Sequence, residues 1–236
     1  MEIQPNIASA AFLIADPARA AMLMCLLDGG ARPAGELAYA AGVTAQTASS
    51  HLGKLLSGGL LSVETQGRHR YYRLGGEHVA AALENLAVIG ATDAMRRRPP
   101  NKEAQKLRFA RCCYDHLAGN IGVSITLALK SHGFLNVAPD KRYDITAAGV
   151  DWFGHMGLEI ATLKSSERGI ARQCLDWTER EHHLAGPLGV RLMSLLCANG
   201  WLRRSLSSRS VQVTSKGWDG LYEHLGINRA QFEDQA

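Results

Sequence analysis

Apolar residues in the first third of the chain recur at helical spacing, in segments separated by glycine. Residues 7–27 are rich in Ala, Leu and Met, with a break and a new helix start at Asp16-Pro17. A short helix is predicted over 35–41, and a longer one begins after Thr44, whose hydroxyl is suited to cap it. This region is therefore expected to be helical.

The helix after Thr44 is amphipathic, and two strands are predicted to follow it. The strands cover 60–63 and 70–74 and flank a Gln66-Gly67 turn. Helix, turn, helix and hairpin is the order of a winged helix-turn-helix, whose second helix lies in the DNA major groove. The helix should bury one stripe, formed by Ala48, Leu52, Leu55 and Leu56, and expose polar side chains on the other face.

The rest of the sequence contains an internal repeat. The octapeptide HLAGNIGV, which begins at His116, returns 67 residues later as HLAGPLGV, beginning at His183. Further matches follow in register, which indicates one structural unit used twice. Each copy has a winged-helix-like order of elements, and a helix is predicted over 102–117. The would-be recognition helices, 123–129 and 190–197, are apolar, so we expect packing or ligand sensing from both copies and not DNA reading.

The predicted fold class is mainly α with small β-hairpins (α+β). A winged helix-turn-helix domain for DNA binding and dimerisation is expected over 1–95, followed by a linker over 96–101. Three arginines and two prolines make this linker a helix boundary, and the arginines could alternatively form an arm that contacts the DNA backbone. The effector-sensing region is expected over 102–236, with copies at about 102–165 and 166–236.

Composition excludes several classes of protein. No apolar run reaches the length of a membrane helix, and the N-terminus lacks the basic segment of a secretory signal, so a cytoplasmic protein without a membrane partner is expected. Five cysteines do not form a disulfide framework, and reduced thiols are expected. The net charge of +4 says little, but 37–63 contains no acidic residue and basic residues follow it, as on a nucleic-acid-binding face.

Several motifs give residues 8–90 a specific resemblance. The ordered matches are Asp16-Pro-Ala-Arg19, Gly35-Glu-Leu-Ala38, Ser50-His51-Leu52, and the hairpin from Gly58 to Leu74. Together they resemble the ArsR-type family of winged-helix bacterial repressors. The resemblance implies a homodimer whose interface is formed by residues 7–27 and 77–94.

The same resemblance implies a DNA-reading surface and excludes the usual metal sites. Many metal-sensing relatives carry two cysteines directly after Glu-Leu, where this chain has Ala38 and Ala40, and the last helix of the domain offers only His78 and Asp93. DNA binding is therefore expected, but metal sensing through the family's usual sites is not. The residues expected to contact DNA are Thr44, Gln46, Thr47, Ser49, Ser50, His51, Lys54, Arg68, His69 and Arg70.

Candidate effector chemistry lies where the two copies begin. Cys113 matches Cys174, Asp115 matches Asp176 and His116 matches His183, if a six-residue insertion is allowed. Pseudo-twofold packing would bring the two Cys/His pairs together, and thiolate with imidazole suits zinc or a thiophilic metal or metalloid. A redox thiol and plain core packing with an organic effector are the alternatives. The candidate set is Cys112, Cys113, His116, Cys174, His182 and His183.

The sequence predicts a DNA-binding transcriptional regulator, most simply a dimeric repressor released by an effector. That effector could be a metal or metalloid, a thiol oxidant or a small organic molecule. The alternatives are an enzyme or cofactor-binding protein that uses the duplicated half, and a constitutive DNA binder without effector. No phosphate loop, nucleophile elbow, paired catalytic carboxylates or HExxH motif is present, so no catalytic residue is assigned and no cofactor is expected to be required for the fold. The effector's identity, the operator and the direction of regulation are not encoded in any motif.

Overall fold

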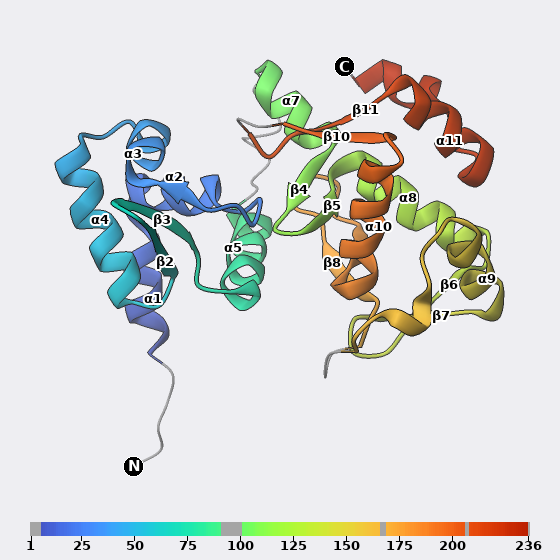
Figure 1. The fold of residues 1–236 in the computed structure, drawn as a ribbon, viewed down its shortest axis with the longest axis horizontal. Coiled ribbons are helices and arrows are strands. Elements are labelled where there is room, and N and C mark those ends of the chain that lie inside the picture. Colours follow the sequence, from blue (N-terminus) through green and yellow to red (C-terminus); the bar gives the residue numbers. More distant parts are fainter. Residues whose placement is uncertain (1–5, 91–100, 166–168, 206–207, 236) are drawn as a thin grey trace, which may run out of the picture. The chain divides into compact units, whose positions relative to one another are not determined.

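A computed structural model describes residues 6–90, 101–165, 169–205 and 208–235. The chain divides into two compact units, 1–83 and 84–236 (Figure 1). Residues 96–100 of the predicted linker, with its arginines, and Asp93 lie outside the described residues. Asn101, the last residue of that linker, caps the helix that follows by accepting from the N–H of Ala104.

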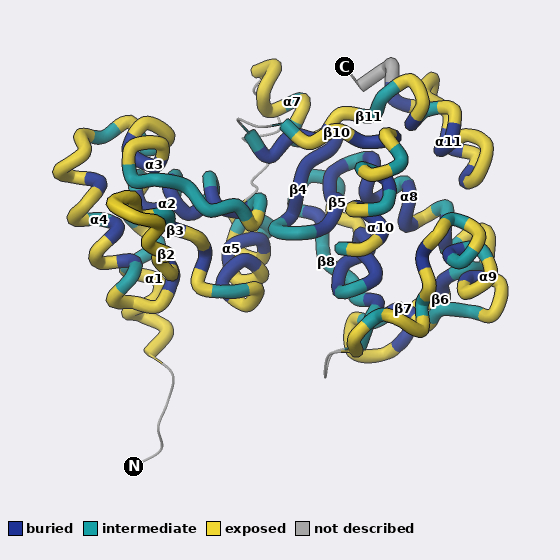
Figure 2. The backbone as a smooth tube through the Cα atoms, viewed as in Figure 1, coloured by how far each residue is buried: buried dark blue, intermediate teal, exposed yellow. Residues whose placement is uncertain are grey.

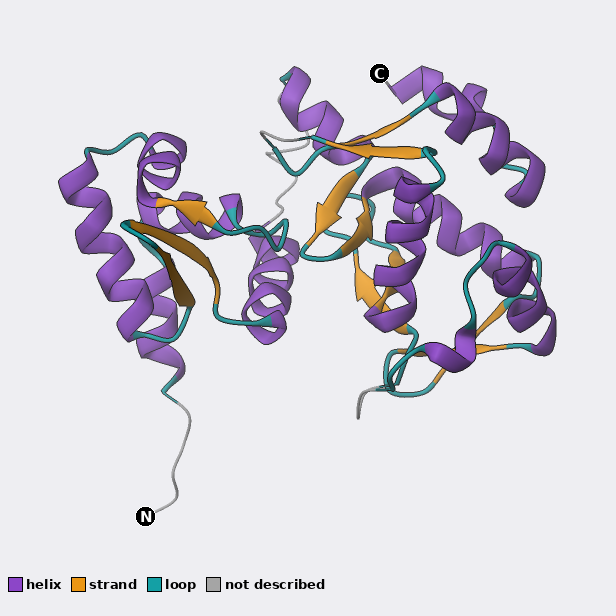
Figure 3. Ribbon diagram, in the orientation of Figure 1, coloured by secondary structure: helices purple, strands orange, loops and turns teal. Residues whose placement is uncertain are grey.

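The first unit has the order of elements that the sequence pattern predicts. Its three-stranded antiparallel sheet has the order β1-β3-β2, and the β2–β3 hairpin forms the wing (Figure 3). Helix α5 (Glu77–Gly90) crosses the division between the two units. The other elements are α1 (Ile7–Ile14), α2 (Pro17–Cys25), β1 (Arg32–Pro33), α3 (Ala34–Ala41), α4 (Ala45–Ser57), β2 (Leu61–Gln66) and β3 (His69–Leu74).

Local caps explain where these helices begin and end. The Asp16 side chain accepts from the backbone N–H of Arg19, and Pro17 occupies the first turn of α2. Thr44 caps α4 by accepting from the N–H of Thr47, as predicted. Gly42 ends α3 in the left-handed conformation (φ 64°), which favours a residue without a Cβ.

The second unit contains the two sequence copies. They share one order of elements, and in the first copy a further helix precedes it. Each copy runs hairpin, helix, hairpin, helix. The first copy comprises α7 (Lys102–Phe109), β4 (Arg111–Cys113), β5 (His116–Ala118), α8 (Gly119–Ser131), β6 (Leu135–Ala138), β7 (Arg142–Ile145) and α9 (Ala147–His155). The second comprises β8 (Arg172–Leu175), β9 (His182–Ala185), α10 (Gly186–Ala198), β10 (Leu202–Arg204), β11 (Val211–Val213) and α11 (Ser215–Leu225). Two 3₁₀ segments, Ile160–Thr162 and Arg229–Gln235, follow α9 and α11.

The helix predicted over 102–117 was wrong in its second half. Helix α7 ends at Phe109, and the next residues form the β4–β5 hairpin around a two-residue turn at Tyr114 and Asp115. The apolar residues that suggested a continued helix lie in strands that are buried on both faces. Such strands do not alternate between apolar and polar residues, so their sequence does not look like that of a half-exposed strand.

The two copies pair reciprocally within the second unit. The N–H of Cys112 donates to the carbonyl of Arg209 at 2.8 Å, and the equivalent N–H of Gln173 donates to that of Lys141 at 2.8 Å. The first hairpin of each copy therefore contacts the second hairpin of the other. Helix α8 packs against β9, and α10 packs against β5. This exchange is the pattern of an isologous dimer made inside one chain.

Glycines that recur in the repeat have a packing reason. A Cβ on Gly149 would lie 2.2 Å from the Phe134 carbonyl oxygen, and one on Gly217 would lie 2.1 Å from that of Trp201. Both follow a threonine, Thr146 or Thr214, that caps the last helix of its copy. The Thr-x-x-Gly motif thus fixes how each final helix approaches the residue that begins the second hairpin of its copy, Phe134 or Trp201.

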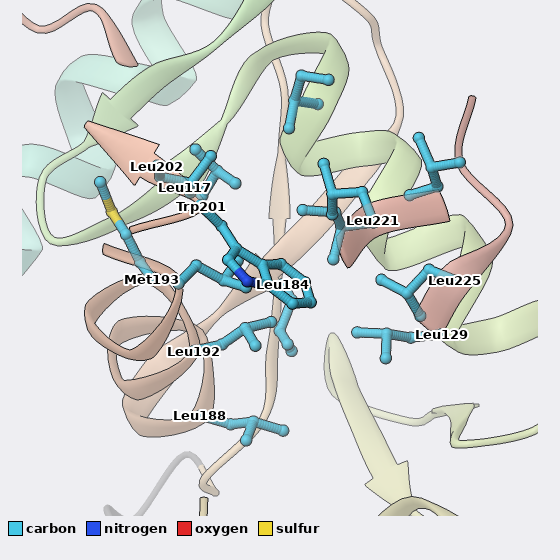
Figure 4. Packing of buried hydrophobic residues seen from close by; sticks show 14 of the residues in the cluster. Leu117, Leu129, Leu184, Leu188, Leu192, Met193, Trp201, Leu202, Leu221 and Leu225 are labelled. Carbon is cyan, nitrogen blue, oxygen red and sulfur yellow. The ribbon is translucent and has the colours of Figure 1, made fainter. Parts of the chain in front are cut away.

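One apolar core serves both copies. Leu117 and Leu184, which follow the two repeated histidines, point into it together with Leu188, Leu192 and other side chains (Figure 4). The tube in Figure 2 is buried along β4 and β5 and mostly buried along α8, whereas α9 and α11 alternate between exposed and buried residues. Trp201 is buried in this core, and Trp152 and Trp218 pack against it.

No single helix among the described residues has the length and apolar character needed to cross a membrane. The helix pair α1 and α2 passes that test only jointly, across an 87° bend.

Candidate functional site

Helix α4 presents the polar face that the sequence predicts. Ala48, Leu52 and Leu55 are buried, which turns the opposite side of the helix outward. Ser49 donates its hydroxyl to the carbonyl of Ala45, so part of its hydrogen-bonding capacity is used within the helix. The exposed members of the predicted DNA-contacting set on and before this helix are Thr44, Gln46, Thr47, Ser49, Ser50 and Lys54.

His51 differs from the other residues of this face because it contacts the start of α2. Its Nδ1 lies 3.5 Å from an Arg19 guanidinium nitrogen, and its Nε2 lies 4.0 Å from Asp16 Oδ1. Arg19 itself is buried and donates to the carbonyls of Phe12 and Leu13. The Asp-Pro-Ala-Arg motif thus holds α1, α2 and α4 together, and His51 is part of that contact.

The wing carries exposed cations at its tip. Arg68, His69 and Arg70 are all exposed. Arg73 lies further along the strand and pairs with Glu64 at 2.8 Å, so it is engaged within the hairpin. The tip residues are therefore better placed than Arg73 to approach phosphates.

In the second unit, a cysteine and a histidine face each other in the first hairpin of each copy. Cys113 pairs with His116 in the β4–β5 ladder, and Cys174 pairs with His183 in the β8–β9 ladder. One ligand atom from each of these four residues lies within 4.8 Å of the others. We call Cys113, His116, Cys174 and His183 the Cys/His cluster. Three of its members are buried and Cys174 is half-buried.

Two like pairs meet at the centre of the cluster. The Sγ atoms of Cys113 and Cys174 are 3.9 Å apart, and the Nε2 atoms of His116 and His183 are 3.1 Å apart. Each pair contains one residue from each copy, so the cluster lies where the two copies of the repeat meet. Two thiols and two imidazoles in this arrangement could hold a zinc-type metal ion.

A carboxylate contacts the outer nitrogen of each histidine. Asp115 Oδ1 lies 3.0 Å from Nδ1 of His116, and Asp176 Oδ2 lies 3.4 Å from Nδ1 of His183. Asp176 is fully buried, and so is Arg111, whose guanidinium donates to it at 3.0 Å. The same carboxylate accepts from the N–H of Gly119 at 2.7 Å, where α8 begins.

Neighbouring charges and burial shift the pKa values of three groups in and beside the cluster. Burial lowers the pKa of His116, but the Cys113 sulfur and the Asp115 carboxylate outweigh it and raise that pKa to about 10. A hydrogen bond to Cys174, together with burial, raises the pKa of the Cys113 thiol. Burial also opposes ionisation of Asp176, yet His183 and Arg111 hold its pKa well below the usual range.

Two residues of the predicted effector set lie outside the cluster. The Sγ of Cys112 contacts the Met193 sulfur at 3.7 Å within the core, and His182 is half-buried at the far side of its strand. The reason is the period of a strand, because neighbours in sequence point to opposite faces. Cys112 and His182 are therefore turned away from Cys113 and His183.

Arg111 is the residue of this site that sequence reasoning missed. Its guanidinium also stacks over the Trp177 ring, 4.8 Å from the ring centroid. A signal was present, since Arg111 and Arg172 occupy equivalent positions two residues before Cys113 and Cys174. A buried arginine requires a buried anion, which would have pointed to Asp176.

The first unit has the arrangement of a winged helix-turn-helix DNA-binding protein. Helices α2, α3 and α4 are followed by the β2–β3 wing, and α4 exposes a polar face. A family model described as a helix-turn-helix domain matches residues 14–64. The uncharacterised HTH-type transcriptional regulator YdfF of Bacillus subtilis is 40% identical over 225 residues, which cover 95% of this chain and 99% of YdfF. This chain belongs to the ArsR-type family of winged helix-turn-helix transcriptional regulators.

Other relatives match a smaller share of the chain. The regulator CmtR of Mycobacterium tuberculosis is 40% identical over 76 residues, which cover 32% of this chain and 64% of CmtR. Its NMR structure, described as that of a cadmium metal-sensor, has a TM-score of 0.31 to this chain. The winged helix-turn-helix domain of Mb0332 from Mycobacterium bovis, described as homodimeric, is 28% identical, covers 43% of this chain and all of that domain, and has a TM-score of 0.35.

Proposed function

We propose that this chain acts as a homodimeric repressor that reads a specific DNA sequence and leaves it when an effector binds to the C-terminal half. The observation that carries the proposal is a carboxylate-free, exposed face on α4 in a chain that also contains the buried Cys/His cluster.

The DNA-contacting part of the proposal is supported by side-chain chemistry. Gln46 and Ser50 can exchange hydrogen bonds with base edges in the major groove. Lys54 on the same helix, and Arg68 and His69 at the tip of the wing, are suited to the phosphate backbone.

The dimeric part is supported by apolar side chains that the single chain leaves exposed. Ile7 and Phe12 on α1 are 77% and 71% exposed, and Ile89 on α5 is 78% exposed. Side chains of this size at such exposure are typical of an interface. They fall in the two segments that the family resemblance assigns to dimerisation.

The effector is proposed to act in the second unit. The positions of the family's cysteine ligands are occupied by Ala38 and Ala40, which offer no donor atoms. The Cys/His cluster instead gathers reactive and metal-binding groups between the two copies. A ligand bound there would change how the copies pack, and the proposal is that this change lowers affinity for DNA.

Fluorescence anisotropy with DNA from upstream of the chain's own gene tests the DNA surface. We expect Lys54→Ala and Arg68→Ala each to weaken binding and to reduce the slope of log affinity against log salt by about 1. Lys216→Ala, an exposed cation on α11, is the matched control and should leave both quantities unchanged. Equal effects from all three variants would argue against α4 and the wing as the reading surface.

The effector is tested on the preformed complex. Zinc, arsenite, peroxide and small aromatic molecules are added one at a time, and the anisotropy is followed. Release by one class supports the repressor, and release by none favours a constitutive DNA binder. Consumption of any of these compounds would favour an enzyme.

A further inference from the structure

We propose that the Cys/His cluster is a tetrahedral site for a single zinc-type divalent ion, held by two ligands from each copy of the repeat. The metal site rests on the proposed function only for its effect on DNA, and the geometry supports metal binding by itself. The expected ligands are Sγ of Cys113 and Cys174 and Nε2 of His116 and His183.

The distances fit a tetrahedral ion. With Zn–S of about 2.3 Å and Zn–N of about 2.0–2.1 Å, a tetrahedron places its sulfurs about 3.8 Å apart and its nitrogens about 3.3 Å apart. The corresponding separations are 3.9 Å between the Cys113 and Cys174 sulfurs and 3.1 Å between the histidine nitrogens. The four ligand atoms lie within 4.8 Å of one another, whereas a tetrahedron places sulfur and nitrogen about 3.6 Å apart, so the side chains would draw inward to close around an ion.

The orientation of the histidines also points to a cation. Nδ1 of His116 lies 3.0 Å from Asp115, whose carboxylate can accept the ring proton. Nδ1 of His183 is buried and lies 3.4 Å from Asp176, without forming a hydrogen bond to it. The two Nε2 atoms face each other at 3.1 Å, close enough for one Nε2–H to donate to the other ring. A metal ion bound by both Nε2 atoms would take the place of that proton. Carboxylate, histidine and metal in a line is the arrangement in which proteins commonly hold zinc.

Charge balance favours a divalent metal at the cluster. Two thiolates neutralise a divalent ion, and the buried Asp176 is already balanced by Arg111.

Soft and borderline ligands select among divalent ions. Thiolate with imidazole suits zinc, cadmium and cobalt, whereas magnesium and calcium prefer oxygen ligands. Because each copy supplies one cysteine and one histidine, a bound ion would tie the β4–β5 hairpin to the β8–β9 hairpin. Metal binding would therefore stabilise the packing of one copy against the other.

The full-length, reduced chain is first treated with a chelator and then titrated with Co²⁺. We expect one ion per chain, with the absorption of tetrahedral cobalt and thiolate-to-cobalt charge transfer, and displacement by Zn²⁺. Cys113→Ser and His183→Gln should each lower the affinity by at least about 100-fold. Cys112→Ala and His182→Gln are the controls, because these neighbours point away from the cluster, and both should bind as the unsubstituted chain does.

Asp115→Asn adds a test that does not remove a ligand. The side chain is half-exposed, so the variant should fold, and the expected loss is about 10–100-fold in Co²⁺ affinity. Far-UV circular dichroism confirms folding for every variant. The metal site is overturned if the folded, reduced chain gives no tetrahedral cobalt spectrum, or if C113S and H183Q bind like their controls.

Two further results separate this inference from the proposed repressor. A tetrahedral cobalt spectrum with unchanged DNA affinity supports the metal site and contradicts metal-driven release. A Cys113–Cys174 disulfide that releases DNA, in a chain whose reduced form binds no Co²⁺, overturns the metal site and keeps the effector function.

Discussion

Asp176 is the residue on which the geometry of the cluster depends most. Its carboxylate contacts Arg111, His183 and the N–H of Gly119, besides several donors in the turn that follows it. Each contact fixes a different element, so the side chain links β4, β9 and the start of α8. The repeat alignment places Asp176 opposite Asp115 but does not predict these partners, because they come from residues 57 and 65 positions away in sequence.

Replacing Asp176 by Asn should strongly destabilise the second unit. The change leaves the Arg111 charge buried without its counter-ion, which costs about 3–5 kcal/mol in the free energy of unfolding. All four tryptophans lie in the second unit, so urea unfolding followed by tryptophan fluorescence reports on it selectively.

Asp115→Asn is the control for Asp176→Asn, since Asp115 is half-exposed and should cost below about 1 kcal/mol. The pKa of Asp176 is held below its usual value, so its contribution is complete above about pH 4. It is lost as the pH falls through the pKa of the folded state, and the difference between wild type and Asp176→Asn should shrink only in acid. Equal destabilisation by the two variants at neutral pH would contradict this account.

At the scale of elements, the sequence predicted the helices and strands of the first unit better than those of the second. The capping residues Asp16 and Thr44 marked the starts of α2 and α4, and Gly42 marked the end of α3. The β4 and β5 strands gave no alternating pattern, because both of their faces are buried, and a helix was predicted in their place. Burial on two faces removes the periodicity on which such predictions rest.

Gly149→Ala should destabilise α9 although alanine favours helices. The added Cβ would lie 2.2 Å from a backbone oxygen of Phe134, which cannot move without shifting the strand, and overpacking of this kind costs about 1–3 kcal/mol. Gly154→Ala in the same helix is the matched control, with its nearest contact at 3.9 Å, and should be neutral or stabilising by up to about 1 kcal/mol. Thermal unfolding measured by tryptophan fluorescence distinguishes the two, and a stabilising Gly149→Ala would refute the close approach.

At the scale of the whole molecule, the duplication and the matched Cys/His pairs were readable from the sequence, but the strand pairing that joins the two copies was not. The octapeptide repeat predicts two similar units, and it leaves open whether each folds alone. The structure pairs the first hairpin of each copy with the second hairpin of the other. That exchange brings Cys113 and His116 to Cys174 and His183, and no local pattern encodes it, since the contacts join residues about 60 positions apart.

Dimerisation is the remaining property that belongs to the whole molecule. Ile7→Glu places a charge where an apolar side chain, 77% exposed in the single chain, is proposed to be buried against a second copy. The loss of apolar burial and the cost of a buried charge together should raise the dimer dissociation constant by about 100-fold or more. Sedimentation velocity measures this directly, and DNA affinity should fall with it because paired half-sites need two reading helices. Val137→Glu on β6, at a residue 63% exposed, is the matched control and should change neither. An Ile7→Glu variant that sediments as a dimer would place the interface elsewhere on the chain.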